Sequence, residues 1–239
     1  RTVDTGSPDV DAFLRHHDDY IDALETTGAL VRQLPELDTY PDSVFVEDVA
    51  LCLPEVAIAM RPGPPSRRGE VAAMRPTLAQ FYDNMLAIDG PGLIEGGDIL
   101  TTEREILIGT SGRTNSTGIE KLRRLLEPWR YKVREVETPA GVLHFKTDCA
   151  VLDEETILTT PRLSASGCFA GYDVIHTVEG EEACANAVRF NEIVLMPSGF
   201  PGTAERLFRR GYNVREIGNT EAAKLDGGMS CLSLRFSPG

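Results

Sequence analysis

Three residues far apart in the sequence, Cys231, His144 and Glu95, are of the types that build a thiol-based nucleophilic site. In such a site a thiolate attacks a carbon atom, an imidazole moves the proton, and a carboxylate orients the imidazole. Each residue alone is weak support, because a lone Cys is more often a small buried hydrophobe and a lone His more often structural. Together they predict nucleophilic catalysis, and the further acids of the chain predict a cationic substrate.

Two adjacent acids, Glu47 and Asp48, stand inside an otherwise apolar stretch at residues 44–51. Such a pair is more often a solvated turn, but carboxylates in so apolar a run require a partner. A further acid, Asp98, directly follows a pair of glycines, which usually mark a turn or a bulge. The sequence leaves open whether Asp98 braces its turn or touches a substrate.

The charge of the chain limits its partners. The 239 residues carry 24 Lys and Arg against 37 Asp and Glu, a net charge of −13, and 41% are hydrophobic. We expect neither nucleic-acid nor membrane partners, because so acidic a chain is repelled by phosphate backbones and anionic lipid surfaces. Apolar runs reach only about five residues, whereas a membrane-spanning helix needs about twenty. A small or cationic partner fits better.

The cysteine content indicates a reducing compartment. The five cysteines, an odd number without a CxxC pair or a nearby histidine, are Cys52, Cys149, Cys168, Cys184 and Cys231. This pattern speaks against a disulfide framework and against a zinc site. No charged-then-apolar signal segment follows Arg1. We therefore expect a cytoplasmic protein with at least one free thiol.

The apolar pattern predicts one amphipathic helix followed by repeated pairs of strands. Residues 7–27 form the helix, with Ser7 as its cap, Pro8 in its first turn and its end before Gly28. Its apolar stripe consists of Val10, Phe13, Leu14, Ile21 and Leu24, and its surface carries His16 and His17. The strand pairs are expected at 44–53 with 56–61, 93–100 with 105–109, 143–152 with 156–160, 184–190 with 193–197, and within 228–236.

The pairs start at residues 44, 93, 143, 184 and 228, so their spacings are 49, 50, 41 and 44 residues. A period of this size is typical of repeat architectures. Strands such as Tyr131–Val136 and Tyr212–Ile217 lead into the next pair, and helical stripes fill the gaps, at Met74, Leu78, Phe81, Tyr82 and Met85, at Ile119, Leu122, Leu125 and Leu126, and at Ala204, Leu207 and Phe208. We expect a single α/β domain over residues 1–239, a closed ring of about five ββαβ units with pseudo-fivefold symmetry. The fifth unit looks truncated, and a strand before Arg1 would complete it.

Six motifs occur in the order known from one enzyme family. They are Asp42-Ser-Val-Phe-Val-Glu-Asp48, Arg61-Pro-Gly-Pro-Pro-Ser-Arg-Arg-Gly-Glu70, Glu95-Gly-Gly-Asp98, Arg113-Thr-Asn115, His144-Phe-Lys-Thr147 and Leu225-Asp-Gly-Gly-Met-Ser-Cys-Leu-Ser-Leu234. The chain thus resembles dimethylarginine dimethylaminohydrolases from about Ser7 to Phe236. These enzymes belong to the guanidine-modifying superfamily of five-bladed α/β propellers, so the resemblance implies that fold.

The resemblance also implies a role for each site residue. It implies that Cys231 is the nucleophile, His144 the general acid and base, and Glu95 the acid that orients His144. The guanidinium end of the substrate would contact Asp42, Glu47 and Asp48, its α-carboxylate Arg67 and Arg113, and its α-amino group the backbone near Leu225 and Asp226. This division fits the chemistry, since carboxylates match a planar cation and the arginine fork matches a carboxylate. A surface charge or a helix cap remains the alternative for each arginine.

The implied activity is hydrolysis of Nω-methylated arginine to citrulline and an alkylamine, without a cofactor or a metal. The related arginine deiminases carry a second acid two positions after the histidine, where this chain has Lys146, and an inserted helical domain for which it has no room. The family's first strand and its lid over the substrate would precede Arg1. A related guanidine or ureido hydrolase and a non-catalytic protein that binds arginine-like ligands are the alternatives, and the acidic helices and hairpin edges are compatible with a homodimer.

Overall fold

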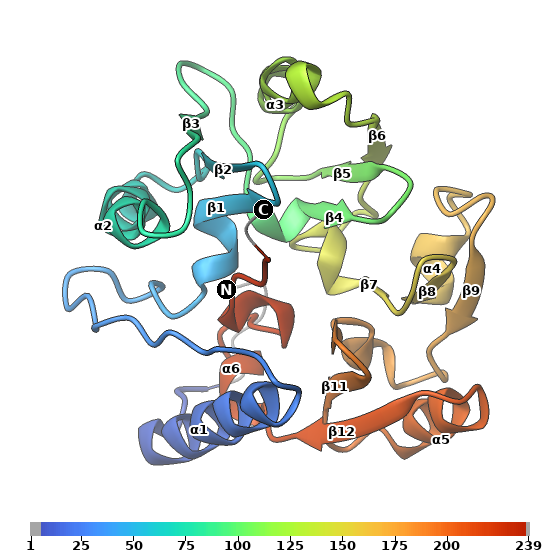
Figure 1. Cartoon of the computed structure of the whole chain (residues 1–239). Helices are drawn as coiled ribbons and strands as arrows, with labels where there is room; N and C mark the ends of the chain where they lie inside the picture. Colours follow the sequence, from blue (N-terminus) through green and yellow to red (C-terminus); the bar gives the residue numbers. More distant parts are fainter. Residues whose placement is uncertain (1–5, 238–239) are drawn as a thin grey trace. The chain divides into compact units, whose positions relative to one another are not determined.

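Four sheets with the same strand pattern make up the α/β fold of this computed structural model, which describes residues 6–237 (Figure 1). In each sheet an antiparallel hairpin is followed by a third strand that pairs in parallel with the second. The sheets are β1 (Ala50–Leu53), β2 (Val56–Ala59) and β3 (Met85–Ala87); β4 (Ile99–Thr101), β5 (Ile106–Thr110) and β6 (Val133–Glu137); β7 (Cys149–Val151), β8 (Thr156–Thr159) and β9 (Asp173–His176); and β10 (Val188–Phe190), β11 (Ile193–Pro197) and β12 (Asn213–Ile217). The predicted strand–strand–helix–strand repeat is confirmed for these four sheets.

The chain divides into two compact units. The first contains the residues up to Leu34 together with Lys146–Ser230, and the second contains Pro35–Phe145 together with the segment from Cys231 onward. The second unit holds the β1–β3 and β4–β6 sheets, the helices α2 (Arg68–Leu78) and α3 (Ser116–Leu126), and the 3-10 helices η2 (Pro65–Arg67) and η4 (Glu127–Trp129). The first unit holds the other two sheets with α1 (Val10–Thr26), α4 (Pro161–Ser164), α5 (Pro201–Arg209) and α6 (Thr220–Ala223).

Further 3-10 helices stand where the sequence predicted the first residues of the leading strands. They are η1 (Val46–Val49), η3 (Gly96–Asp98), η5 (Phe145–Thr147), η6 (Glu182–Ala185) and η7 (Ser230–Leu232). The strands β1, β4, β7 and β10 begin only after these turns, so the predicted starts at 44, 93, 143 and 184 are wrong, and residues 228–236 form no strand. Polar side chains cause the difference, because buried carboxylates and amides bind nearby backbone groups that would otherwise pair with a strand.

A buried polar side chain at the end of one such turn accepts a hydrogen bond from the backbone of the next turn. The contacts, from donor to acceptor, are Gly97 N–H to Asp48 Oδ1 at 2.9 Å, Phe145 N–H to Asp98 Oδ1 at 2.8 Å, and Ser230 N–H to Asn186 Oδ1 at 2.8 Å. The first two lie in the second unit and the third in the first unit. Successive turns are therefore tied to one another by side chains rather than by strand pairing.

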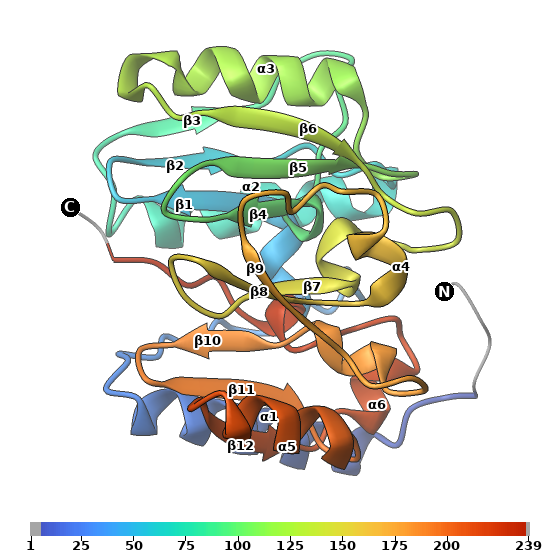
Figure 2. The ribbon, with the colours of Figure 1, turned by 90° about the vertical axis from the view of Figure 1, so that its right-hand side faces the viewer.

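Helix α3 shows how the sequence positions a repeat. Asn115 caps its start by accepting a hydrogen bond from the N–H of Gly118 at 3.0 Å. The predicted stripe is confirmed, since Ile119, Leu122 and Leu126 are buried in one cluster with the β1–β3 and β4–β6 sheets. Figure 2 shows α3 running along the β4–β6 sheet.

The equivalent helix α5 buries Leu207 but leaves Phe208 exposed, so the prediction for Phe208 is wrong. The stripe after the first pair is wrong in part, because α2 ends at Leu78, while Phe81 is exposed, Tyr82 lies in a loop and Met85 begins β3.

Helix α1 differs from its predicted form at its N-terminus. The helix starts at Val10 and is capped by Asp9, whose carboxylate accepts from the N–H of Ala12 at 2.9 Å, so the assignment of Ser7 as cap is wrong. Its second half buries Tyr20, Ala23 and the predicted Ile21 and Leu24, whereas the predicted Val10 and Leu14 are exposed. The chain leaves the helix at Gly28, which has a φ of +88°. His16 and His17 are half-buried rather than on the surface.

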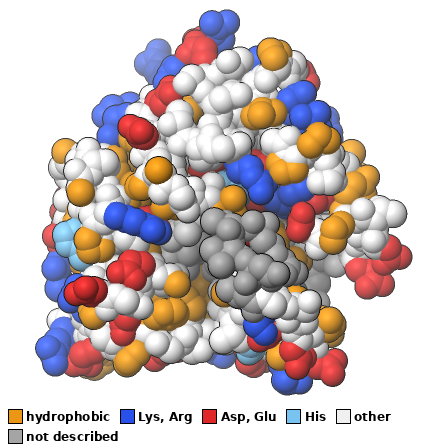
Figure 3. Space-filling view, turned by 180° about the vertical axis from the view of Figure 1, so that it is seen from behind, with side chains coloured by type: hydrophobic (Ala, Val, Ile, Leu, Met, Phe, Trp, Pro, Cys, Tyr) orange, Lys and Arg blue, Asp and Glu red, His pale blue; other side chains and the backbone are white. Residues whose placement is uncertain are grey.

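The surface carries charges of both signs. Acidic and basic side chains alternate with apolar ones on the face that Figure 3 shows. Across residues 6–237, none of the helices has the length and apolar content needed to cross a membrane.

Gly96 offers a test of how tightly the turns are packed. A Cβ atom at Gly96 would lie 1.9 Å from the carbonyl oxygen of Glu47, whereas one at Gly112 would meet nothing within 4 Å. We expect Gly96→Ala to destabilise the protein by about 2 kcal/mol or more, because backbone cannot yield as a side chain does. Gly112→Ala should change stability by less than about 0.5 kcal/mol. Urea unfolding measures both, and equal midpoints would contradict the packing of η3 against η1.

Candidate functional site

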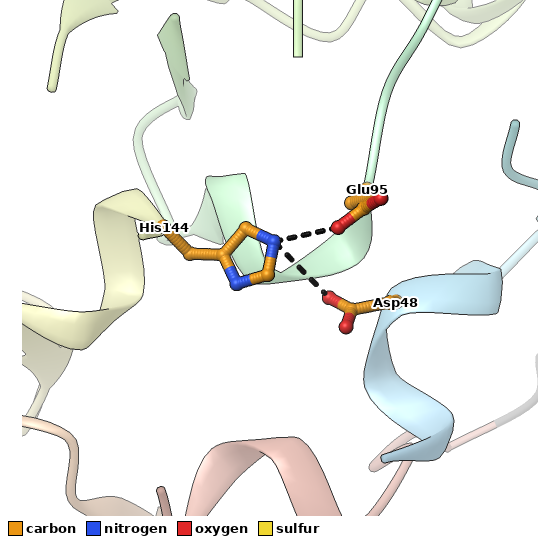
Figure 4. A group of neighbouring side chains, drawn as sticks. All are labelled: Asp48, Glu95 and His144. Carbon is orange, nitrogen blue, oxygen red and sulfur yellow. Dashed lines mark hydrogen bonds and ion pairs between the residues drawn. The ribbon is translucent and has the colours of Figure 1, made fainter. Parts of the chain in front are cut away.

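Three predicted site residues, His144, Glu95 and Asp48, meet in the second unit. His144 Nε2 lies 2.7 Å from Glu95 Oε2 and 3.9 Å from Asp48 Oδ1 (Figure 4). All three residues are buried, and Glu95 has no exposed surface. The repeat explains the convergence, because Asp48 lies in η1, Glu95 directly precedes η3 and His144 directly precedes η5.

Glu95 uses both carboxylate oxygens. Oε2 contacts His144, while Oε1 accepts a hydrogen bond from the N–H of Gly63 at 2.9 Å and lies 3.5 Å from Arg113 Nη1. The N–H of Glu95 donates to Thr114 Oγ1 at 3.1 Å. A buried carboxylate is stable only with such partners. Gly63 and Thr114 therefore support the site, although the sequence marked them only as members of the two arginine motifs.

Asp48 is held by Arg67. Arg67 Nη1 donates to Asp48 Oδ2 at 2.5 Å, and its other nitrogens bind Glu70 at 2.8 Å and the carbonyl oxygen of Phe45 at 2.9 Å. Burial alone would lower the pKa of Arg67, but the hydrogen bond with Glu70 and the charge of Asp48 outweigh it and raise that pKa. Burial likewise acts to raise the pKa of Asp48, and the charges of His144 and Arg67 reverse this effect. Arg67 is thus a buried partner of Asp48, and its interpretation as a surface charge is wrong.

Glu47 also has an arginine partner. Arg235 Nη2 lies 2.8 Å from Glu47 Oε1, and Arg235 Nη1 donates to the carbonyl and hydroxyl oxygens of Ser233, each at 2.8 Å. The neighbouring Phe236 packs against the buried cluster that follows Glu47 in the chain. Arg235 was not singled out from the sequence, although an arginine between Leu and Phe, four residues after Cys231, was a signal for a buried ion pair.

Cys231 lies in η7 and is half-buried. The residues after it are held beside η1 by the Arg235–Glu47 pair and by the packing of Leu234 and Phe236, so the segment that carries Cys231 returns to the Glu47–Asp48 turn within the second unit. All five cysteines are free thiols. Burial raises the pKa of Cys52 to about 12 and that of Cys184 to about 11, which keeps these two thiols protonated at neutral pH.

His144 is held in its protonated form. Burial would lower its pKa, but the charge of Asp48, the hydrogen bond to Glu95 and the charge of Asp98 outweigh burial and raise the pKa to about 9. At neutral pH the ring is therefore an imidazolium that can donate a proton. The ring lies against Gly97, where a Cβ atom would come within 2.8 Å of it.

The remaining predicted residues take different positions. Asp98 is a brace, because its two oxygens accept hydrogen bonds from the N–H of Phe145 and from Ser111 Oγ. Asp42 is exposed, and its carbonyl oxygen accepts from Arg67 Nη2 at 3.3 Å. Arg113 is half-buried and precedes Asn115, the residue that caps α3, so Arg113 is no helix cap. Leu225 and Asp226 are half-buried in the first unit, directly after α6, and Asp226 has a positive φ of 62°.

Within residues 6–237, one group of side chains offers enough donor atoms for a metal ion. Asp48, Glu95 and His144 each present one donor, and these atoms lie within 4.8 Å of one another. The carboxylate oxygens that face His144 are already occupied, because Asp48 Oδ1 accepts from the N–H of Gly97 and Glu95 Oε2 faces the imidazolium proton. A metal ion would have to displace that proton, because a histidine binds metal only as the neutral ring. The arrangement favours a proton over a metal.

Comparison with known proteins defines the class of this chain first. The family model described as arginine deiminase matches residues 69–196. The fold, the buried Asp48–Glu95–His144 group and this match place the chain in the arginine deiminase class of α/β proteins.

Closer relatives define the family. A curated N(G),N(G)-dimethylarginine dimethylaminohydrolase of Pseudomonas aeruginosa is 39% identical over 97% of this chain and 91% of its own length. A second one, of Streptomyces coelicolor, is 33% identical over 93% of this chain and 85% of its own length. A solved structure of the Pseudomonas protein, a cysteine-to-serine mutant complexed with citrulline, has a TM-score of 0.94 at 39% identity, covering 97% of this chain and 91% of that one. The chain belongs to the dimethylarginine dimethylaminohydrolase family.

The raised pKa of His144 has a consequence for stability. A group whose folded pKa lies above its unfolded value stabilises the fold fully below the unfolded pKa and loses this contribution as pH rises through the folded pKa. For His144 the two values are 6.5 and about 9, so we expect the free energy of unfolding to fall by about 3 kcal/mol between pH 6.5 and 9. Urea unfolding at several pH values measures this fall.

The matched control is the exposed His176 in β9. His176→Asn should keep the decline, whereas His144→Asn should be less stable at pH 6.5 and show a smaller decline. An unchanged pH dependence in His144→Asn would show that another group is responsible.

Proposed function

We propose that this protein hydrolyses Nω-methylated L-arginine to L-citrulline and an alkylamine through a covalent intermediate on Cys231. The observation that carries the proposal is the buried imidazolium of His144 between two carboxylates, in a chain of this family. Such a group supplies the proton that a departing amine needs. The complex of the 39% identical Pseudomonas structure with citrulline supports citrulline as the product here.

In the proposed reaction the thiolate of Cys231 attacks the central guanidinium carbon and forms a C–S bond. His144 gives its proton to the alkylamine as the C–N bond breaks, which leaves a thiouronium attached to Cys231. The neutral His144 then takes a proton from water while the hydroxide adds to the same carbon. The C–S bond breaks and the thiolate is restored, the hydroxyl proton of the adduct passes to the released alkylamine or to solvent, and citrulline leaves with the oxygen of that water.

The binding contacts follow from charge. We assign the guanidinium end of the substrate to Glu47, Asp48 and Asp42, because carboxylates match a planar cation. The α-carboxylate is assigned to Arg113, whose side chain is 27% exposed. For Arg67, the other arginine expected to hold the α-carboxylate, the buried contacts with Asp48 and Glu70 support a role in fixing Asp48 instead. For the α-amino group, the resemblance to the family is the support for the backbone near Leu225 and Asp226.

For the fold as a whole we propose a five-bladed propeller in a single domain. Four blades correspond to the four sheets of identical strand pattern, and the fifth to the segment around η7, which carries the same kind of 3-10 turn. The five free thiols support a cytoplasmic location, since a reducing compartment keeps thiols from pairing.

Two other functions remain to be separated by experiment. A related guanidine or ureido hydrolase would act on another arginine-like substrate with the same three catalytic residues. A non-catalytic protein for arginine-like ligands would have no use for a nucleophile, and the buried His144–Glu95 pair speaks against it.

The proposed function predicts the products of the intact protein. Incubated with arginine, monomethylarginine, dimethylarginine and citrulline, the protein should convert the methylated arginines to citrulline, as measured by mass spectrometry. Cys231→Ser should abolish this conversion, because a hydroxyl is a far weaker nucleophile. Cys52→Ser is the matched control, since Cys52 is also half-buried, and it should retain activity. Full activity of Cys231→Ser would exclude the mechanism.

Substitution of the two acids should separate binding from chemistry. Asp48→Asn removes a charge-assisted contact worth about 1.5–3 kcal/mol, so kcat/KM should fall at least roughly tenfold, with a rise in KM that Glu95→Gln does not share. Glu95→Gln should lower kcat and leave KM nearly unchanged. Glu105→Gln is the control, because Glu105 is a buried acid of the same unit that pairs with Arg134. Steady-state kinetics measures all three, and equal effects of the first two on KM would refute the separation.

A further inference from the structure

Arg113 differs from Arg67 in how much of its hydrogen-bonding capacity is used. The Arg67 side chain is 5% exposed and its guanidinium binds Asp48, Glu70 and backbone oxygens. The Arg113 side chain is 27% exposed. Among residues 6–237, its guanidinium has a single polar contact, the one of 3.5 Å with Glu95 Oε1. A guanidinium has five N–H donors, so Arg113 can take up an additional anion.

Arg113 and His144 share one carboxylate. Glu95 Oε2 lies 2.7 Å from His144 Nε2, and Glu95 Oε1 faces Arg113. Glu95 has no exposed surface, so water screens its contact with His144 very little, whereas the charge of the 27% exposed Arg113 is partly screened. Arg113 competes with the imidazolium for the negative charge of Glu95 and also repels the imidazolium as a like charge.

We infer that Arg113 couples anion binding to the proton on His144: a carboxylate that binds Arg113 takes its positive charge away from Glu95, which then holds the imidazolium more firmly. The proposed function supplies the identity of the anion, the α-carboxylate of an arginine derivative. The contact chain Arg113–Glu95–His144 does not depend on that function.

The coupling makes the general acid depend on the whole substrate. A methylated guanidine without an α-carboxylate would bind beside a His144 that gives up its proton to solvent more readily. The carboxylate therefore helps to keep the general acid protonated in addition to anchoring the substrate, although it lies at the end remote from the reacting carbon.

The other charged groups around His144 are separate from Arg113. Asp48 acts on the ring from η1 and is paired with Arg67, and Asp98 acts on the ring from η3. Arg113 is connected to Asp98 through its backbone rather than its side chain: its N–H donates to Ser111 Oγ at 3.0 Å, and Ser111 Oγ donates to Asp98. A change of the Arg113 side chain thus alters the Glu95 contact and leaves the remaining partners of His144 in place.

The test follows the titration of His144 by NMR in the whole protein. Removal of a cation at this range shifts a pKa measurably, so in Arg113→Gln the pKa of His144 should rise by about half a unit or more, and in Arg113→Lys by less. The control is Arg68→Gln, which removes the same charge from the exposed Arg68, near Gly63 but without contact to Glu95. It should leave the titration unchanged. An unchanged or lowered pKa in Arg113→Gln would overturn the coupling.

A second arm uses the unmodified protein, so it does not depend on the folding of a variant. L-Citrulline should raise the pKa of His144, whereas L-citrulline amide, which lacks only the negative charge, should not. Equal shifts with both ligands would overturn the coupling while citrulline binding upheld the proposed function. Failure of citrulline to bind would overturn the proposed function and the identity of the anion as its α-carboxylate. A raised pKa of His144 in the ligand-free Arg113→Gln variant would then still establish the coupling through the contact chain Arg113–Glu95–His144.

Discussion

The structure depends on buried side chains that accept hydrogen bonds from the backbone of the following 3-10 turn. In the second unit Asp48 binds the N–H of Gly97, and Asp98 binds the N–H of Phe145. A buried amide without a partner is unfavourable by about 1–3 kcal/mol, so each contact fixes where the next turn begins. The candidate site residues Glu47, Glu95 and His144 lie within three positions of these contacts in the sequence. Positioning the turns and positioning the site are thus the same physical problem.

Charge balance is the second constraint. Three buried acids of the site have arginine partners: Glu47 pairs with Arg235, Asp48 with Arg67, and Glu95 with Arg113. Uncompensated carboxylates in an apolar interior would bind protons instead of staying charged. The pairs offset these buried negative charges, and the imidazolium of His144 lies between Asp48 and Glu95. A cationic ligand at this site meets carboxylates that are oriented before it arrives.

Much of this could be predicted from the sequence, and the exceptions have physical causes. The repeat of strand pairs and the stripe of α3 follow from apolar periodicity, and the acids inside an apolar run pointed to buried partners. The strand starts were wrong by several residues because Asp48 and Asp98 bind backbone groups that periodicity treats as free to pair. The partner of Glu47 was missed because Arg235 lies 188 positions away. The apolar periodicity of a short sequence segment carries no information about contacts between residues so far apart in the chain.

That span has a consequence for folding kinetics. The second unit is discontinuous: the chain leaves it at Phe145 and returns at Cys231. Closing so long a loop is entropically unfavourable and slows the step that requires it. His144, Glu95 and Asp48 all lie in the continuous segment Pro35–Phe145. Cys231 and Arg235, the counter-ion of Glu47, lie together on the segment that returns to this unit. The nucleophile and the counter-ion of Glu47 thus depend on the same long-range closure of the chain.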